Sequence, residues 1–470
     1  MKNFCLNSWS RAGLAAATAL VLNACAPGQD APSPTVASLN VSRYLAVGDS
    51  YTAGLSAGGL TLASQQYSYP NLLAQQLRGA QPNATFSQPL LAAGAGTGYF
   101  DLAGYTAQGF PRTRRVPGPA VRRLVINPAA CGGADTVRLL TRTDAPGTLP
   151  QNLGVAGLRL TQAQVTNLGN ESNATPTGAF NPYFERILPA ANPRSYLQVV
   201  TEAAASATFF TYFLGLDDLM PYVRSGGQCG TAPGTSLSNQ LRTNAQAVLG
   251  VLTAGGRPGI IASLPELNTL PLLRLGRGFT LQKRLQDSYG DNALLYIEDP
   301  FGSGVGQAIT NDDYVLATTL PRIGQFTSVV VGGTTLMLPY GRDVRNPLRD
   351  ADVMDYDEMN RVTGAVSSYN NELNRLARDV YKMPALNTSA LPYLLDTSGV
   401  MPGYASEALS VSGVQYSAEP VRGNFFSLDY YTLTPRGNAL LANAFIAALN
   451  QAYKTKIPAI DANALPSVAQ

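Results

Sequence analysis

Short apolar runs of strand character alternate with amphipathic helical segments along this 470-residue chain. The clearest runs are residues 43–48 (RYLAVG), 207–214 (ATFFTYFL) and 259–264 (GIIASL). Runs without polar alternation indicate strands that are covered on both faces, as in parallel sheets. Because parallel neighbours need helical crossovers, this alternation predicts a three-layer α/β/α domain with a mainly parallel sheet.

The helical segments between these runs are marked by spacing and by end signals. Apolar residues recur every three or four positions from Met359 to Val380, the clearest amphipathic pattern in the chain. Thr434 and Pro435 open the last helix as N-cap and first-turn proline. The predicted helices cover residues 70–78, 237–252, 359–380 and 435–449.

Two stretches, residues 80–150 and 270–350, break the alternation, and we interpret them as insertions into one domain. In the second, Gly332 and Gly333 separate two β-prone runs and predict a hairpin over residues 327–338. Residues 391–395 have the character of a further strand.

The N-terminus has the parts of an export signal. Lys2 and Arg11 supply positive charge, and the apolar run Ala12–Leu22 is too short for a bilayer span, which needs roughly 20 residues. The run ends in Leu-Asn-Ala-Cys, which is similar to a bacterial lipobox, so Cys25 is predicted to carry a lipid. Plain secretion with cleavage nearby is the alternative.

A lipid on Cys25 would anchor the exported protein to a membrane. Residues 26–41 are rich in Pro, Ser and Ala and are typical of a flexible tether. Ala26 follows the lipidated position in place of aspartate, which favours the outer membrane or the periplasmic face. The predicted organisation is a signal peptide (1–24), a tether (25–41), one domain (42–456) with insertions near 80–150 and 270–350, and a C-terminal tail (457–470).

Four cysteines are present. Cleavage removes Cys5 and lipidation uses Cys25, which leaves Cys131 and Cys229. An even pair in an exported protein is a disulfide candidate, and two free thiols are the alternative. In the chain-entropy model, the loop that this disulfide closes would stabilise the folded state by up to roughly 4–5 kcal/mol.

The chain contains no histidine and has a net charge of +3. The lack of histidine excludes histidine-ligated metal sites and histidine bases, and the small charge gives no indication of nucleic-acid binding.

The acidic stretch Asp350–Glu358 lacks the spacing of a calcium loop, so we expect it to cap the long helix rather than bind a metal. Five arginines are expected to form a solvated basic loop, with envelope anions as the alternative ligand: Arg112, Arg114, Arg115, Arg122 and Arg123.

Four short motifs occur in a fixed order: residues 48–55 (GDSYTAGL), 152–157 (NLGVAG), 215–218 (GLDD) and 429–438 (DYYTLTPRGN). Together they resemble the conserved blocks of the SGNH (GDSL) hydrolases, and most closely the large bacterial lipoprotein members. The resemblance spans residues 45–450. It implies the flavodoxin-like α/β/α fold of that family and Ser-His-Asp ester hydrolysis without a cofactor.

The resemblance makes Ser50 the nucleophile, Asp429 the residue that orients the base, and the N–H groups of Ser50 and Gly157 donors to the oxyanion. Two positions depart from the pattern. Thr432 stands where the family has histidine, and a hydroxyl has no useful basicity near neutral pH. Asp217 stands where the family has asparagine, and an ionised carboxylate only accepts hydrogen bonds. A protonated Asp217 could still donate.

Two functions follow from these departures. The favoured one is a catalytically impaired SGNH-fold lipoprotein of the cell envelope that binds a glycan, a lipid or an envelope protein, or that acts structurally. The alternative is a working serine esterase, lipase or acyl-modifying hydrolase in which Asp217 or Asp429 replaces the missing base.

Overall fold

The computed structural model describes residues 34–118, 124–126, 136–143, 148–175, 179–299, 305–389, 408–420 and 422–468. The chain separates into two units, Met1–Ser33 and Pro34–Gln470, and every element below belongs to the second. Its main sheet has five strands, and each neighbouring pair is parallel. In spatial order they are β15 (Ala385–Leu386), β8 (Gly259–Ala262), β7 (Phe209–Phe213), β1 (Tyr44–Gly48) and β6 (Asn152–Gly154).

Counted along the chain, these strands lie in the order 2-1-3-4-5 from β6 to β15. This is one of the strand orders of doubly wound sheets, in which ligands bind outside the carboxyl ends of the strands where the order reverses. Here that point lies between β1 and β7. The predicted α/β class with a parallel sheet is therefore confirmed.

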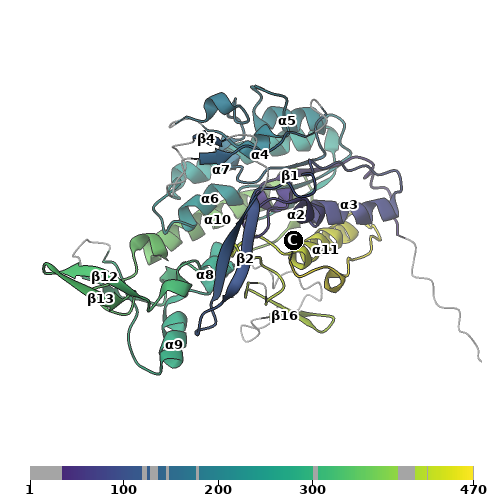
Figure 1. Cartoon of the computed structure of the whole chain (residues 1–470). Helices are drawn as coiled ribbons and strands as arrows, with labels where there is room; N and C mark the ends of the chain where they lie inside the picture. Colours follow the sequence, from purple (N-terminus) through teal and green to yellow (C-terminus); the bar gives the residue numbers. More distant parts are fainter. Residues whose placement is uncertain are drawn as a thin grey trace, which may run out of the picture. The chain divides into compact units, whose positions relative to one another are not determined.

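Helices flank the sheet in two groups, with β1 between them (Figure 1). On one side α3 (Tyr69–Ala80) packs against α11 (Pro435–Tyr453), and on the other α7 (Thr235–Leu252) packs between α5 (Tyr196–Ala204) and α10 (Tyr356–Arg375). Every residue of β1, β7 and β8 is buried, as the unbroken apolar runs predicted.

The two best-marked helix starts are built as their sequences indicate. At α10, the Asp355 side chain accepts the Glu358 amide at 2.8 Å, and the Glu358 carboxylate accepts the Asp355 amide at 3.1 Å. This reciprocal capping box confirms that the acidic stretch begins the long helix. At α11, Thr434 accepts the Gly437 amide at 3.0 Å and Pro435 takes the first turn.

The insertions form small antiparallel hairpins. The first insertion contains β2 (Gly98–Tyr105) paired with β3 (Pro111–Pro117), and the second contains the predicted hairpin of β12 (Phe326–Val331) and β13 (Thr334–Pro339). The remaining α-helices and strands are α1 (Ser50–Ala53), α2 (Leu62–Gln66), α4 (Pro182–Glu185), α6 (Leu216–Val223), α8 (Pro271–Arg274), α9 (Gly278–Tyr289), β4 (Leu124–Ile126), β5 (Thr136–Arg138), β9 (Tyr296–Ile297), β10 (Gln307–Ala308), β11 (Tyr314–Val315), β14 (Val353–Met354), β16 (Ala408–Val411) and β17 (Val414–Ser417).

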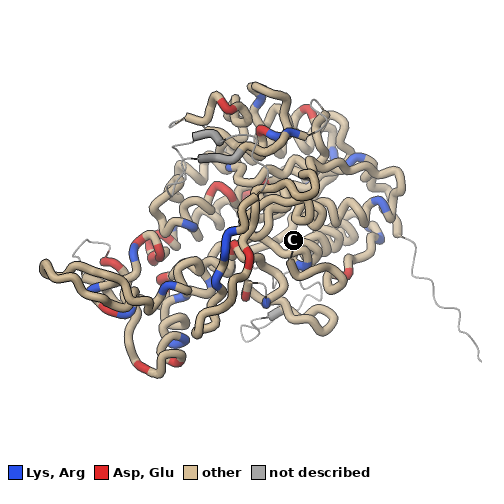
Figure 2. The backbone as a smooth tube through the Cα atoms, in the orientation of Figure 1, with Lys and Arg blue, Asp and Glu red and all other residues tan. Residues whose placement is uncertain are grey.

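The three arginines that the structure describes are exposed to solvent as expected, but they lie in strand β3 and not in a loop (Figure 2). Arg114 forms an ion pair with Asp101 at 2.7 Å across the hairpin. Arg115 donates to the carbonyl of Gly58 at 2.8 Å and lies over the Phe100 ring, so it fastens the hairpin to the loop that follows α1. Arg122, Arg123 and the expected strand over residues 391–395 lie outside the described residues. Of the helices in the described ranges, none is both long and apolar enough to cross a membrane.

The backbones of β1, β6 and α1 approach one another closely. A Cβ atom on Gly154 would lie 2.4 Å from the backbone nitrogen of Ala53 and the backbone carbon of Thr52. A Cβ atom on Gly48 would lie 2.4 Å from the carbonyl oxygen of Phe213. These atoms belong to fixed backbone, so neither position has room for a side chain.

We therefore expect Gly154→Ala to lower the free energy of unfolding by about 3 kcal/mol or more, because overpacking here cannot be relieved by a rotamer change. Urea unfolding followed by circular dichroism measures this. Gly250→Ala is the matched control, since no atom lies within 4 Å of its added Cβ in α7 and the change should be neutral or stabilising by up to about 1 kcal/mol. Equal effects of the two substitutions would contradict the packing argument.

Candidate functional site

Three loops meet at the carboxyl ends of neighbouring strands. The register pairs Gly48 at the end of β1 with Gly154 of β6 and with Phe213 of β7. Ser50 begins α1 just after β1, Gly157 follows β6, and Asp217 lies in the first turn of α6 after β7. The parallel register therefore brings these three predicted residues together.

A single carboxylate oxygen connects the three loops. Oδ2 of Asp217 accepts from the Ser50 hydroxyl at 2.6 Å, from the Ser50 amide at 3.0 Å and from the Gly157 amide at 2.9 Å. The Gly157 amide also lies 3.1 Å from the Ser50 hydroxyl oxygen. Both side chains are buried, Ser50 at 1% and Asp217 at 5% exposed. The two amides that the family resemblance assigns to an oxyanion thus already have an acceptor.

Buried polar side chains hold these loops in place. The Asp49 carboxylate at the end of β1 accepts the amides of Gly215 at 3.0 Å and Leu216 at 2.9 Å, which fixes the start of α6. The Asn181 amide donates to the carbonyl of Ala156 at 3.0 Å. That bond supports Gly157, whose φ of 69° lies in the left-handed region that favours glycine.

The neighbouring acid, Asp218, points away from Ser50. Its carboxylate accepts the amide of Leu160 at 2.6 Å, and the amide and hydroxyl of Thr161 at 3.0 and 2.7 Å. These bonds cap the short 3₁₀ turn over Leu160–Gln162. Asp218 therefore has a structural role, while Asp217 faces the serine.

Burial dominates the electrostatics of this cluster. Burial raises the pKa of Asp217, which the hydrogen bonds from Ser50 and Gly157 partly offset. It also raises the pKa of Asp49, and the charge of Asp217 raises it further. Burial also raises the pKa of Asp218 to about 6. Three carboxyl groups at one helix start therefore favour their protonated forms more than free aspartate does.

Asp429 and Thr432 form a second cluster that is closed on itself. The Thr432 hydroxyl donates to the Asp429 carboxylate, which also accepts the Thr432 amide at 2.8 Å and the Gly58 amide at 2.7 Å. Ser427 donates its hydroxyl to the same carboxylate at 3.0 Å. Within the described part of the chain, no hydrogen bond joins Asp429 or Thr432 to Ser50.

The residue of this loop that reaches Ser50 is Tyr431, which the sequence analysis did not identify. Its phenol is buried and lies near the Ser50 hydroxyl, and burial raises its pKa, an effect that the charge of Arg224 partly offsets. The guanidinium of Arg224 lies 5.6 Å from the centre of its ring. A phenol whose pKa is raised stays protonated at neutral pH, so Tyr431 is not a base for Ser50. In the sequence, the feature that could have pointed to Tyr431 is its position next to Thr432 in the fourth motif.

The remaining predicted site residues are cysteines. Cys229 takes part in a disulfide, and Cys25 and Cys131 lie outside the described residues, as does Cys5. Among the residues that the structure describes, no three Cys, Asp or Glu side chains lie close enough to hold a metal ion.

Comparisons of this chain with protein-family models, with curated proteins and with solved structures found no match. The geometry of the site is what indicates its chemistry. That geometry places one serine hydroxyl, two backbone donors and one carboxylate within hydrogen-bonding distance of one another.

The buried acids predict an unusual dependence of stability on pH. A carboxyl group whose pKa is raised in the folded state stabilises the fold below its unfolded pKa, near 4, and this contribution is lost as the pH rises through the folded value. For Asp218, with a folded pKa of about 6, the loss between pH 4 and pH 7 is roughly 2 kcal/mol.

We expect the free energy of unfolding of the wild-type protein to fall over this range, and Asp218→Asn to reduce the fall by that amount. Guanidinium unfolding at several pH values tests both points. Two results would show that burial does not disfavour the ionised form of these carboxyl groups. One is a wild-type stability that rises from pH 4 to pH 7, and the other is a slope of stability against pH that Asp218→Asn leaves unchanged.

Proposed function

We propose that this protein is a cell-envelope lipoprotein built on the SGNH hydrolase scaffold, and that it is catalytically impaired and works as a binding or structural protein. Its ligand would be a glycan, a lipid or another envelope protein, and a lipid on Cys25 would anchor it to the membrane. The four motifs support the family, and the placement of Ser50 after β1 of a 2-1-3-4-5 sheet agrees with it.

The observation that carries the proposal is the position of Asp217 Oδ2 against the two backbone donors. Acyl transfer needs those donors for the oxyanion that forms when a serine attacks a carbonyl. If the carboxylate moved aside to admit the oxyanion and stayed about 4 Å from it, their repulsion would cost about 4 kcal/mol at an effective dielectric constant of 20. This is as large as the 3–4 kcal/mol that one well-placed donor contributes.

The same oxygen is also the acceptor of the Ser50 hydroxyl proton. If it stays in place, it occupies the position that the substrate oxygen needs. If it moves away to admit substrate, Ser50 loses its acceptor. With Asp217 at this position, the reaction cannot have both free oxyanion donors and an acceptor for the Ser50 proton.

A second function is favoured by one specific distance. The 2.6 Å hydrogen bond from Ser50 to Asp217, together with the burial that raises the Asp217 pKa, suits a carboxylate that acts as general base. In that case the protein is a serine esterase or acyl-modifying hydrolase whose base is Asp217. The two functions differ in whether Ser50 supports turnover.

Hydrolysis of a short-chain p-nitrophenyl ester and labelling by a fluorophosphonate probe distinguish them. We expect the wild-type protein to match Ser50→Ala in both assays, because Ser50 has no acceptor that leaves its oxyanion donors free. Robust wild-type turnover that is lost in both Ser50→Ala and Asp217→Asn would reject the proposal and establish the second function.

A gain-of-function experiment tests the same idea in the opposite direction. Thr432→His/Asp217→Asn restores the imidazole beside Asp429 and replaces the blocking carboxylate with an amide donor. We expect Ser50-dependent ester hydrolysis to appear in this double variant, and to disappear when Ser50→Ala is added. Circular dichroism spectra and thermal melting of all variants control for folding, because Thr432 is fully buried.

A further inference from the structure

The β12–β13 hairpin in the second insertion has an unpaired edge. Among the strands that the structure describes, β12 pairs only with β13, with Phe326 opposite Pro339, Ser328 opposite Met337 and Val331 opposite Thr334. The side of β12 that faces away from β13 therefore carries backbone groups without a strand partner.

The register shows which groups these are. Opposite residues in an antiparallel ladder alternate between hydrogen-bonded and non-bonded pairs. The Tyr340 amide donates to the carbonyl of Gln325 at 2.9 Å, and Pro339 has no N–H, so the pair that contains Phe326 is non-bonded. It follows that the N–H and C=O groups of Phe326, Ser328 and Val330 point away from β13, at intervals of roughly 7 Å.

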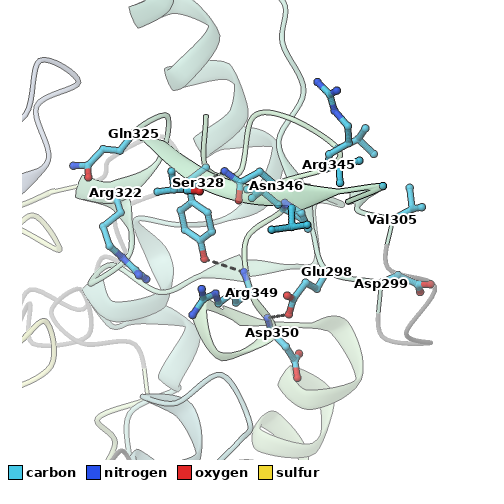
Figure 3. A pocket seen from close by; sticks show the side chains of 18 residues that line it. Glu298, Asp299, Val305, Arg322, Gln325, Ser328, Arg345, Asn346, Arg349 and Asp350 are labelled. Carbon is cyan, nitrogen blue, oxygen red and sulfur yellow. Dashed lines mark hydrogen bonds between the residues drawn. The ribbon is translucent and has the colours of Figure 1, made fainter. Parts of the chain in front are cut away.

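A groove of about 960 Å³ runs along this edge (Figure 3). Every residue from Thr327 to Gly332 lines it, whereas none from Thr334 to Pro339 does. Since successive side chains of a strand point to opposite faces, a groove lined by all of them follows the edge of the hairpin and not one of its faces. Its volume lies within the range of ligand pockets.

The opposite wall of the groove is held by side-chain hydrogen bonds to its backbone. The Asp350 amide donates to the Glu298 carboxylate at 2.8 Å, and the Arg349 amide donates to the Tyr340 hydroxyl at 3.0 Å (Figure 3). Three arginines and three acids line the groove, so their charges balance: Arg322, Arg345, Arg349, Glu298, Asp299 and Asp350.

The edge itself lacks the features that usually prevent strand addition. Proteins protect exposed edges with charged residues, prolines or bulges. The strand Phe326–Val331 contains no charged residue and no proline, and its pairing with β13 has no register shift (Figure 2). Phe326 is 67% exposed and Val330 is 69% exposed.

We propose that this groove binds an extended, apolar and uncharged segment of another polypeptide, which adds to the hairpin as a third strand along β12. Backbone hydrogen bonds to Phe326, Ser328 and Val330 supply the affinity, as in other cases of β-strand addition. The uncharged sequence of β12, with Phe326 and Val330 largely exposed, favours an apolar and uncharged segment as its neighbour. The site is separate from Ser50 and does not depend on whether Ser50 is catalytic.

The probe for the experiment is a fluorescein-labelled hexapeptide, TTLMLT, which copies β13 with threonine in place of its proline. Fluorescence anisotropy measures its binding to the full-length protein. We expect Ser328→Pro to weaken binding at least tenfold, because it removes an N–H that faces the groove and takes no part in the β13 ladder. The absence of saturable binding to the wild-type protein at millimolar peptide overturns the proposal.

Met337→Pro is the matched control, because Met337 lies opposite Ser328 and its N–H faces the other edge of the hairpin. We expect it to change the dissociation constant by less than twofold. Equal weakening by the two prolines shows that the hairpin was damaged rather than the groove edge, and counts against the assignment of binding to β12.

Amide hydrogen exchange on the wild-type protein avoids any question of variant folding. Addition of the peptide should slow exchange at Phe326, Ser328 and Val330 and leave Thr335 and Met337 unchanged. If the β12 amides are already protected without peptide and the protein sediments as a dimer, the edge pairs with a second copy and the proposal for another polypeptide is wrong.

Discussion

The parallel register of β6, β1 and β7 is the constraint on which the rest of the site depends. It aligns Gly154, Gly48 and Phe213, so the loops that leave these strands begin at the same level. The close approach of α1 to β6 is possible because Gly154 has no side chain. From this alignment follow the meeting of Ser50, Gly157 and Asp217 and the capping of α6 by Asp49. A shift of one residue in the pairing with β6 would separate the serine from Gly157, and a shift in the pairing with β7 would separate it from Asp217.

Sequence reasoning predicted the parts of the fold that local patterns determine. The runs at 43–48, 207–214 and 259–264 are strands because they are apolar throughout, and α10 and α11 begin where their caps indicate. The strands β6 and β15 were missed because each has only two or three residues, too few for a periodic pattern. They are extended because they pair with β1 and β8, which is information that lies elsewhere in the chain.

The candidate site divides in the same way. The motifs identified Ser50, Gly157 and Asp217, and the lack of histidine was visible in the composition. The sequence could not show that Asp217 would accept from both amides, because that depends on the rotamer of one side chain between three loops. Nor could it show that Tyr431, rather than Thr432, lies next to Ser50, because neighbouring residues of a loop point in different directions.

The place of Asp429 in the fold has a physical explanation that needs no catalysis. A buried carboxylate without partners would cost several kcal/mol, so Asp429 needs hydrogen-bond donors. Thr432, Gly58 and Ser427 supply them. The carboxylate in turn joins the loop after α1 to the loop before α11. Removal of Asp429 would leave those donors unsatisfied, so the fold retains it whether or not Ser50 reacts. Asp217 has a similar structural role, since it is the acceptor for the backbone amides of Ser50 and Gly157.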